Sequence, residues 1–440
     1  MEKDKITVRG LSGLNNIGNT CYMNSALQCI SASDIFISYL IKKKFVSDLK
    51  DNIVQELASI EREKKKKQGK YVDDDNLSVY LKDVKKKYYG SLVYNSYKLF
   101  KTMWKGNTKV TPKTFKNVLG EFSSTFRGYS QQDSQEFINF MLDKIHEEIK
   151  CEVTVKYKNI PKDIVEYMEK RKEMYSSLQI EENSHKLEDK LKEFEIFKVH
   201  HAREETIYRS LDFWDNYIKK NYSPIIDLFT GLFINEINCS KCNNKSRRFE
   251  PFNILPLEIP DSASTIKDCL TEFGKGAKLT GDNQYHCDIC KEKNDAEKKM
   301  FFWDLPELLI IQFKRFHNNG RSTRKNTTSI KYPFENLTFE ENYHEYRPRN
   351  YKFNLYGVVY HMGSLNGGHY ISYTKNPINN KWYKFNDDSV FHIPDDKIEH
   401  EIMDAGSYIL FYKKVYNNSE ISLDEMGESD GGFTSEEDVS

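Results

Sequence analysis

The sequence has few cysteines, no long apolar run and no excess charge of either sign. Eight cysteines are spread over 440 residues, and Lys plus Arg equals Asp plus Glu at 66 each. So sparse a set of cysteines argues against a disulfide framework and favours catalytic, metal-binding or buried thiols in a reducing compartment. The balanced charge argues against a chain that attracts nucleic acid or membranes as a whole.

Its apolar residues are also dispersed along the chain. No run of about 18 apolar residues occurs, so no membrane span is expected. Residues 1–10 lack the apolar segment of a secretory signal, which leads us to expect a cytoplasmic location, a nuclear one, or both. A chain of this length exceeds the usual size of one core, so two or three lobes are expected.

The character of the chain changes near residue 225. Before that point apolar residues recur at helical spacing, and after it short aromatic and β-branched runs are typical of strands. Two lysine-rich or strongly charged segments, about 41–95 and 150–220, are interpreted as helical insertions with solvated faces. We expect 415–440 to be a disordered acidic tail, because residues 417–440 contain eight Asp or Glu and no Lys or Arg.

Cys21 follows a turn-rich loop, GLNNIGNT, and begins a segment with helical spacing. A helix N-terminus carries partial positive charge and favours the thiolate form of a cysteine placed there. Asn16 in the same loop could donate its amide N–H to a developing oxyanion, a contact typically worth about 3 kcal/mol in the transition state. The alternative interpretation is a buried structural cysteine beside an asparagine-containing turn.

His369 is a candidate base for that thiol. Gly367 and Gly368 directly before it remove two side chains, which permits the close approach of another chain. Asn386 or Asp387, after the strand-like run KWYKF, could orient the imidazole, as the third member of a triad does. The alternatives are a surface histidine in a hairpin and ordinary turn chemistry in the sequence NDDS.

Two CxxC pairs predict a metal site. Cys239 and Cys242 form the first pair and Cys287 and Cys290 the second, with 44 residues between Cys242 and Cys287. Four thiolates are the ligand set of closed, tetrahedral zinc sites, so the zinc would be structural and not catalytic. His286 is a less favoured ligand, and unrelated buried thiols or a redox CxxC are the alternatives.

Residues 128–148, GYSQQDSQEFINFMLDKIHEE, form the best-marked helical segment. Asp133 is placed to cap this helix, and Glu136 three residues later would complete a reciprocal capping box.

Taken in order, these segments resemble the ubiquitin-specific protease family of papain-like cysteine proteases. The motifs are GLNNIGNTCYMNSALQC, GYSQQDSQEF, the two CxxC pairs, LIIQFKRF, GGHYISY and KWYKFNDDSV, and they span residues 11 to 414 after a short extension, 1–10. The resemblance implies an α+β fold with a helical thumb, zinc-ribbon fingers and an antiparallel β palm. These three parts would occupy about 11–222, 225–300 and 301–414.

The resemblance also implies a role for each candidate residue. It makes Cys21 the nucleophile and His369 the general base of a deubiquitinating enzyme, which hydrolyses the (iso)peptide bond after the last glycine of ubiquitin through a thioester. Its partners would be ubiquitin and ubiquitinated proteins. The other assignments are the oxyanion donor Asn16, the tail-arginine ligands Asp133 and Glu136, and the space-leaving Gly367 and Gly368.

The third catalytic residue is left open between two neighbours. Asn386 stands where the family usually has aspartate, and it ranks first, with Asp387 second. A neutral amide can orient the imidazole, but it offers no full charge to the imidazolium.

Two other functions compete with hydrolysis. A catalytically weak or inactive ubiquitin-binding pseudo-protease would be expected to lack the cysteine or the histidine, and this chain has both. A zinc-ribbon protein that binds nucleic acid would leave Cys21 and His369 unexplained, so no nucleic-acid partner is expected.

Overall fold

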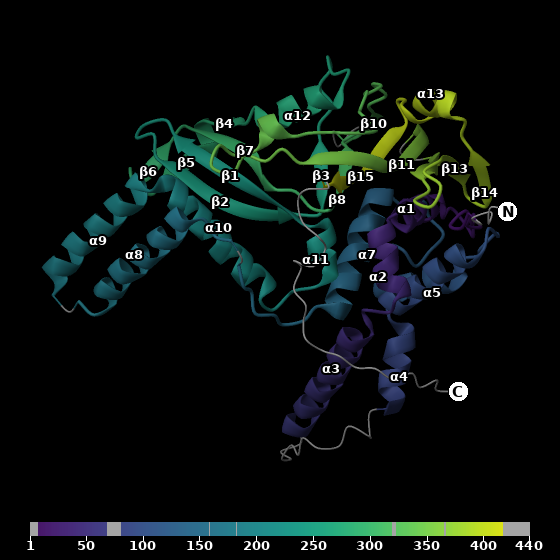
Figure 1. Ribbon diagram of the computed structural model, residues 1–440, viewed down its shortest axis with the longest axis horizontal. Helices are drawn as coiled ribbons and strands as arrows, with labels where there is room; N and C mark the ends of the chain where they lie inside the picture. Colours follow the sequence, from purple (N-terminus) through teal and green to yellow (C-terminus); the bar gives the residue numbers. More distant parts are fainter. Residues whose placement is uncertain are drawn as a thin grey trace, which may run out of the picture.

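The computed structural model of the protein describes residues 8–67, 81–157, 159–181, 183–318, 323–364 and 367–416. Helices dominate before residue 225 and strands after it, which gives an α+β fold (Figure 1). The predicted acidic tail beyond Tyr416, residues 1–7 of the predicted extension and residues 68–80 of the first charged segment lie outside the described residues.

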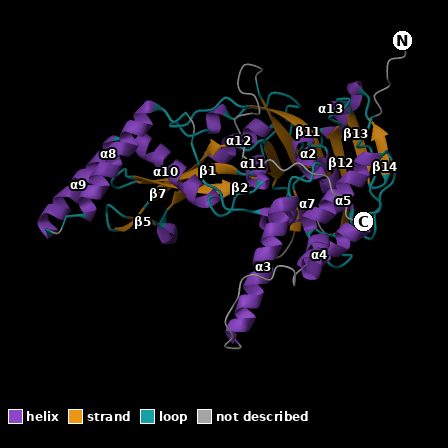
Figure 2. Ribbon diagram, turned by 60° about the horizontal axis from the view of Figure 1, so that its bottom comes forward, coloured by secondary structure: helices purple, strands orange, loops and turns teal. Residues whose placement is uncertain are grey.

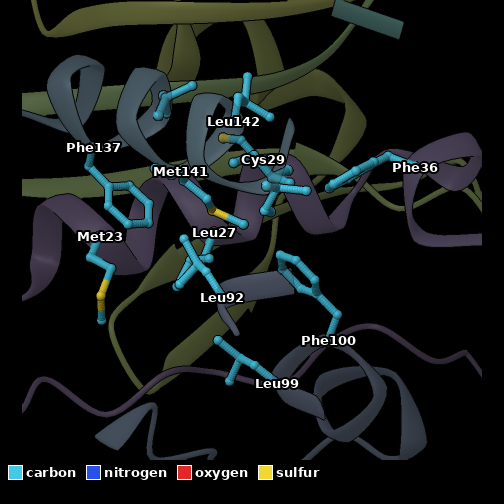
Figure 3. Packing of buried hydrophobic residues seen from close by; sticks show 14 of the residues in the cluster. Met23, Leu27, Cys29, Phe36, Leu92, Leu99, Phe100, Phe137, Met141 and Leu142 are labelled. Carbon is cyan, nitrogen blue, oxygen red and sulfur yellow. The ribbon is translucent and has the colours of Figure 1, made fainter. Parts of the chain in front are cut away.

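The thumb is a cluster of helices built around one buried helix. Its members are α1 (Cys21–Ser31), α2 (Asp34–Ile41), α5 (Leu92–Lys105), α6 (Lys113–Phe122) and α7 (Ser134–Ile149). All eleven residues of α1 are buried, as expected of a helix with packed neighbours all round. Figure 3 shows Met23 and Leu27 of α1 close to Phe137 and Met141 of α7. This packing fixes the helix that begins with Cys21.

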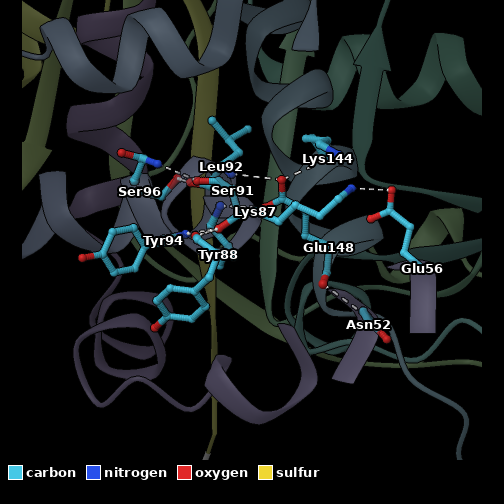
Figure 4. Close-up of polar contacts among 12 residues, drawn as sticks. Asn52, Glu56, Lys87, Tyr88, Ser91, Leu92, Tyr94, Ser96, Lys144 and Glu148 are labelled. Carbon is cyan, nitrogen blue, oxygen red and sulfur yellow. Dashed lines mark hydrogen bonds and ion pairs between the residues drawn. The ribbon is translucent and has the colours of Figure 1, made fainter. Parts of the chain in front are cut away.

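The first charged segment forms a helical hairpin that projects from the thumb, made of α3 (Val46–Lys67) and α4 (Leu81–Gly90) (Figure 2). Asn52 of α3 donates to the carbonyl of Glu148 in α7 at 3.1 Å, and Lys87 of α4 pairs with Glu56 of α3 at 2.6 Å (Figure 4). The Glu148 carboxylate accepts the first two backbone N–H groups of α5 at 3.0 and 2.8 Å. These contacts anchor the hairpin to the thumb.

The second charged segment forms a helical arm beside a four-stranded sheet made of strands β2, β1, β7 and β4, which is described below (Figure 1). Its helices are α8 (Lys162–Gln179), α9 (Ser184–His200) and α10 (Ala202–Ile218). Ile207 and Trp214 of α10 pack against Ile234 and Trp303 of that sheet. The chain then returns to the thumb in α11 (Pro224–Phe229), with proline at the favoured first position. None of the described helices is long and apolar enough to cross a bilayer.

The fingers contain a four-stranded sheet and a short hairpin. The sheet order is β2-β1-β7-β4, and the hairpin consists of β5 and β6. The bounds are β1 (Gly231–Cys239), β2 (Lys245–Phe252), β4 (Ala277–Leu279), β5 (Tyr285–Cys287), β6 (Glu292–Asn294) and β7 (Ala296–Asp304). The hairpin strands have three residues each, too few to be stable in isolation.

The palm is a seven-stranded sheet of order β14-β13-β12-β11-β15-β8-β3. Its strands are β3 (Ile254–Leu257), β8 (Leu308–Phe313), β11 (Lys352–Ser364), β12 (Gly367–Lys375), β13 (Trp382–Asn386), β14 (Ser389–His392) and β15 (Ser407–Val415). The α-helices and strands not yet named are α12 (Ile266–Gly274), β9 (Phe316–Asn318), β10 (Thr323–Lys325) and α13 (Ile398–Ile402).

The palm differs from the prediction in one strand. It is antiparallel except at β3, which pairs in parallel with β8 although it lies inside the range predicted for the fingers. The short apolar run ILPL predicts a strand, but nothing local to it specifies the partner strand, which is set by tertiary packing.

Candidate active site

Cys21 is the first residue of α1, as the loop pattern predicts. The loop before it turns sharply, with positive φ values of 113° at Gly18 and 50° at Asn19. A Cβ at Gly18 would overlap the ring of Tyr129, so the close approach of that ring requires glycine. Cys21 itself is 3% exposed. The thiol therefore lies at the positive end of a buried helix, where the thiolate is favoured.

His369 lies on β12 and hydrogen-bonds both Cys21 and Asn386. Its Nε2 is 2.7 Å from Oδ1 of Asn386, which leaves Nδ1 for the thiol. The pKa of His369 is raised from 6.5 to about 9, chiefly by the hydrogen bond to Cys21, while burial opposes the rise and Asn386 adds to it. A protonated imidazole beside a cysteine stabilises the thiolate, so the pair favours an ion-paired nucleophile.

Both candidates for the third position lie in the site, but they contact different groups. Asn386 ends β13 and faces the imidazole. Asp387 has a positive φ of 49°, which turns its side chain toward the loop before α1. Its Oδ2 accepts from Nδ2 of Asn16 at 3.0 Å, and its Oδ1 accepts from Nδ2 of Asn24 at 2.8 Å. Asn386 thus contacts the imidazole, and Asp387 holds the loop before α1.

The amide of Asn16 is fixed at both ends. Its Oδ1 accepts from the backbone N–H groups of Gly18 and Thr20, both at 3.1 Å. Its Nδ2 donates one hydrogen to Asp387. An amide NH₂ has two donor hydrogens, so the second remains available to an oxyanion.

The two carboxylates assigned to substrate binding differ in availability. Asp133 caps α7 by accepting from the N–H of Gln135 at 2.6 Å, and its Oδ2 accepts from the Tyr408 hydroxyl at 2.7 Å. Burial raises the pKa of Asp133, and these hydrogen bonds oppose the rise. Glu136 is exposed and does not return a bond to the N-cap, so the predicted reciprocal capping box was wrong. Glu136 is therefore the more accessible of the two carboxylates.

The two glycines before His369 are not equivalent. A Cβ at Gly367 would have no atom of the described residues within 4 Å, whereas a Cβ at Gly368 would overlap the buried imidazole of His361. The space in front of Gly367 fits the predicted approach of another chain. At Gly368 the absence of a side chain is required by packing inside the protein, which the sequence did not indicate.

The four CxxC cysteines form one cluster. Their Sγ atoms all lie within 4.8 Å of one another, and those of Cys242 and Cys287 are 3.6 Å apart. Asn243 and Lys291, directly after the two pairs, have positive φ values of 56° and 58°, so each knuckle ends in a left-handed turn. The four thiols are close enough to hold one metal ion, and four cysteines suit zinc. His286 is exposed and is not part of the cluster.

Comparisons with known proteins show the family of the chain. A family model described as "Ubiquitin carboxyl-terminal hydrolase" matches residues 12–412. The probable ubiquitin carboxyl-terminal hydrolase R319 of Acanthamoeba polyphaga mimivirus is 30% identical over 436 residues, covering 92% of this chain and 90% of that protein. The human ubiquitin carboxyl-terminal hydrolase 2 is 28% identical and covers 92% of this chain. The chain spans only 56% of that human relative's length.

Solved structures share the fold. The yeast SAGA Ubp8/Sgf11/Sus1/Sgf73 DUB module bound to ubiquitin aldehyde includes a chain that matches with a TM-score of 0.60 at 22% identity. The match covers 95% of this chain and 72% of that chain. A second structure of the module, bound to monoubiquitin, has a TM-score of 0.59 at 23% identity. The predicted arrangement of thumb, fingers and palm is thus confirmed as a fold.

Proposed function

The chain belongs to the ubiquitin carboxyl-terminal hydrolase family and is a thiol-dependent deubiquitinating enzyme, and we propose that Cys21 is its nucleophile and His369 its general base. The observation that carries this proposal is the His369 imidazole, which hydrogen-bonds the Cys21 thiol on one side and Asn386 on the other. This is the arrangement that a cysteine nucleophile needs: a proton acceptor in contact and a third group that fixes the ring.

The proposed reaction begins with the ion pair. The Cys21 thiolate attacks the carbonyl carbon of ubiquitin's last glycine, and the free N–H of Asn16 with the backbone N–H of Cys21 stabilises the oxyanion. The tetrahedral intermediate collapses to a thioester as His369 protonates the departing lysine amine. Neutral His369 then takes a proton from water, and the resulting hydroxide attacks the thioester carbonyl. Collapse of the second intermediate expels the Cys21 thiolate, which restores the ion pair, and frees the glycine carboxylic acid, which loses its proton to solvent.

Substrate recognition is assigned to groups around this pair. Ubiquitin and ubiquitinated proteins are the proposed substrates, in line with the family and with the ubiquitin bound in the structures that share the fold. Exposed Glu136 is the first ligand for the arginines of the ubiquitin tail, and Asp133, already bonded to Tyr408, is the second. The open space at Gly367 would admit the tail's glycines.

Zinc is the proposed metal of the cysteine cluster. Cys239, Cys242, Cys287 and Cys290 would supply all four ligands, so no position would be left for water or substrate. The metal would hold the β5–β6 hairpin to the end of β1 and take no part in the chemistry. None of the eight cysteines forms a disulfide, and a reducing location in the cytoplasm, the nucleus or both is proposed.

Covalent labelling tests the assignment of the nucleophile. We expect a ubiquitin probe with a C-terminal electrophile to label one cysteine, and mass spectrometry to place the adduct on Cys21. Cys21→Ser should abolish the adduct, whereas Cys151→Ser, at a half-buried thiol outside the site, should label like the wild type. An adduct on any other cysteine would contradict the assignment.

The two residues after Phe385 should differ in what their loss does. Asn386→Ala removes the partner of His369 Nε2, so we expect the alkaline limb of the pH–rate profile to shift to lower pH together with a fall in kcat. Asp387→Ala releases Asn16, so we expect a loss of kcat of about 10²-fold, similar to that of Asn16→Ala. The alkaline limb should move less than in Asn386→Ala, because the Asp387 charge raises the pKa of His369 by less than the hydrogen bond to Asn386 does.

A double variant separates the two roles. Asn16→Ala combined with Asp387→Ala should be little worse than either single change, because both changes remove one interaction. Additive losses would show that Asp387 acts apart from Asn16.

A further inference from the structure

Part of strand β12 has a free edge at the catalytic histidine. On one side β12 pairs with β11 from Gly367 to Thr374. On the other side β13 pairs only with residues 372–375. The backbone of residues 367–371 thus has no strand neighbour on that side within the described chain. Such an edge leaves N–H and C=O groups that need other partners.

The side chain of Gln131 occupies this edge. Its Nε2 donates to the carbonyl oxygen of Gly368 at 2.7 Å, and the Gly368 N–H donates to its Oε1 at 3.4 Å. One side-chain amide thus bonds both backbone groups of a single residue, as a neighbouring strand would. Gln131 belongs to the thumb loop before α7 and lies 237 residues before Gly368 in the sequence. Its side chain therefore bonds the thumb to the palm at the residue next to His369.

Gly368 is also confined from behind. A Cβ at this position would overlap the ring of His361, which is 2% exposed and lies on β11. Burial, with the nearby charges of Lys325 and His369, lowers the pKa of His361 to about 4, so this ring stays neutral while His369 is charged. The Gly368 backbone therefore contacts both a buried, uncharged ring and the Gln131 amide.

A second bridge joins the same thumb loop to the palm. Oδ2 of Asp133 accepts from the Tyr408 hydroxyl at 2.7 Å, and that hydroxyl accepts from Nε2 of Gln312 at 2.8 Å. Tyr408 lies on β15 and Gln312 on β8, two central strands of the palm. The loop is thus tied to the palm at two points, and Gln131 is tied at the point adjacent to the base.

We propose that Gln131 is a positioning residue: by bonding both backbone groups of Gly368, it holds the start of β12 so that the His369 imidazole stays between Cys21 and Asn386. The inference rests on the proposed function, because it gives His369 the role of base. It assigns Gln131 a task distinct from contact with substrate. Loss of the amide would let the free edge move, and the imidazole would spend less time against the thiol.

The test compares Gln131→Met with Gln132→Met. Methionine keeps the length of the side chain but makes neither hydrogen bond, and Gln132 has no hydrogen bond within the described chain. Three measurements are needed: kcat and KM for a ubiquitin C-terminal amide reporter, the pH dependence of Cys21 alkylation by iodoacetamide followed by mass spectrometry, and the melting temperature.

For Gln131→Met we expect kcat to fall about tenfold, as the loss of two modest hydrogen bonds allows, with KM little changed. The alkylation profile of Cys21 should move to higher pH, because the thiolate loses part of its imidazolium partner. Gln132→Met should match the wild type in all three measurements. Should Gln131→Met fail to fold, Gln131→Glu keeps the acceptor and places a carboxylate against the Gly368 carbonyl, and the same shifts are expected.

The results that would overturn the role of Gln131 can be told apart from those that would overturn the proposed function. A rise in KM with unchanged kcat and an unmoved alkylation profile would make Gln131 a substrate contact and overturn the inference. A lower melting temperature with no change in the alkylation profile would reduce it to a structural bond, which also overturns it. If the Cys21→Ser variant still hydrolyses the reporter like the wild type, the proposed function itself fails. If hydrolysis depends on Cys21 but Gln131→Met behaves like the wild type, only this inference fails.

Discussion

Replacing His369 with alanine is expected to lower kcat for a ubiquitin C-terminal amide reporter by about 10⁴-fold, the usual cost of removing one member of a cooperating nucleophile–base pair. The substitution removes the group that keeps Cys21 as thiolate and that protonates the departing amine. Because the two residues act as a unit, adding Cys21→Ser to His369→Ala should cost little more than either single change. Initial rates with purified variants would measure both effects.

A matched histidine controls for the loss of an imidazole. His185 is exposed at the start of α9 in the helical arm, far along the chain from the site, and His185→Ala should hydrolyse the reporter like the wild type. Retention of more than about a tenth of the wild-type kcat by His369→Ala would contradict its role as base.

The pH dependence of the hydrolysis rate follows from the hydrogen bond between His369 and Cys21. The pKa of His369 is raised to about 9 by the hydrogen bond to Cys21, so the imidazole is charged at neutral pH and becomes neutral as pH rises through about 9. The wild-type rate should therefore decline on the alkaline side near that value, because the amine then lacks its proton donor. The stabilisation from this pair is present below the ordinary histidine pKa and is lost over the same alkaline interval.

Removal of the metal is expected to have the second large effect, at the opposite end of the molecule. Stripping zinc with a chelator, or substituting Cys290→Ser, should release the β5–β6 hairpin, because two strands of three residues cannot hold together without it. Structural zinc in small domains contributes about 10–16 kcal/mol of apparent binding free energy, so the fingertip should lose its structure rather than loosen.

Loss of zinc should change the kinetic constants in a different way from the substitutions of Cys21 and His369. Cys21 and His369 lie in the thumb and palm, so their ion pair should survive and the Cys21 alkylation profile should keep its shape. We expect the loss to fall mainly on KM for whole ubiquitin, since the fingers would no longer grip its folded body. Elemental analysis should find about one zinc per chain in the wild type.

Cys151→Ser serves as the matched control, since Cys151 is a free thiol outside the cluster. Its zinc content and KM should equal those of the wild type. A wild-type protein without bound zinc, or a Cys290→Ser variant that keeps its full zinc content and KM, would contradict the assignment of the metal site.

Much of the chemistry could be predicted from residues in their order. The loop GLNNIGNT followed by helical spacing placed Cys21 at a helix start, and two CxxC pairs supplied four ligands of one kind. Both inferences depend on short-range rules: which residues turn, which propagate a helix, and how many thiols lie within reach of one another. Such rules act over a few residues, so the sequence expresses them directly.

The sequence left open how distant residues meet. It offered Asn386 and Asp387 for one role, and only the fold separated them, because the positive φ at Asp387 turns one side chain toward Asn16 while the other faces His369. It predicted a capping box in which Glu136 does not take part. It also gave no sign that Gln131 would meet Gly368 across 237 residues.

The sequence by itself therefore determined the α+β class and predicted the proposed reacting groups and metal ligands, because these follow from residue type and local spacing. The tertiary structure alone decided which side chains hydrogen-bond His369, which glycine is required by packing, and which loop bonds the start of β12. Those relations depend on the packing of lobes whose segments lie hundreds of residues apart, and the free energy that aligns them is a sum over the whole core rather than over any motif.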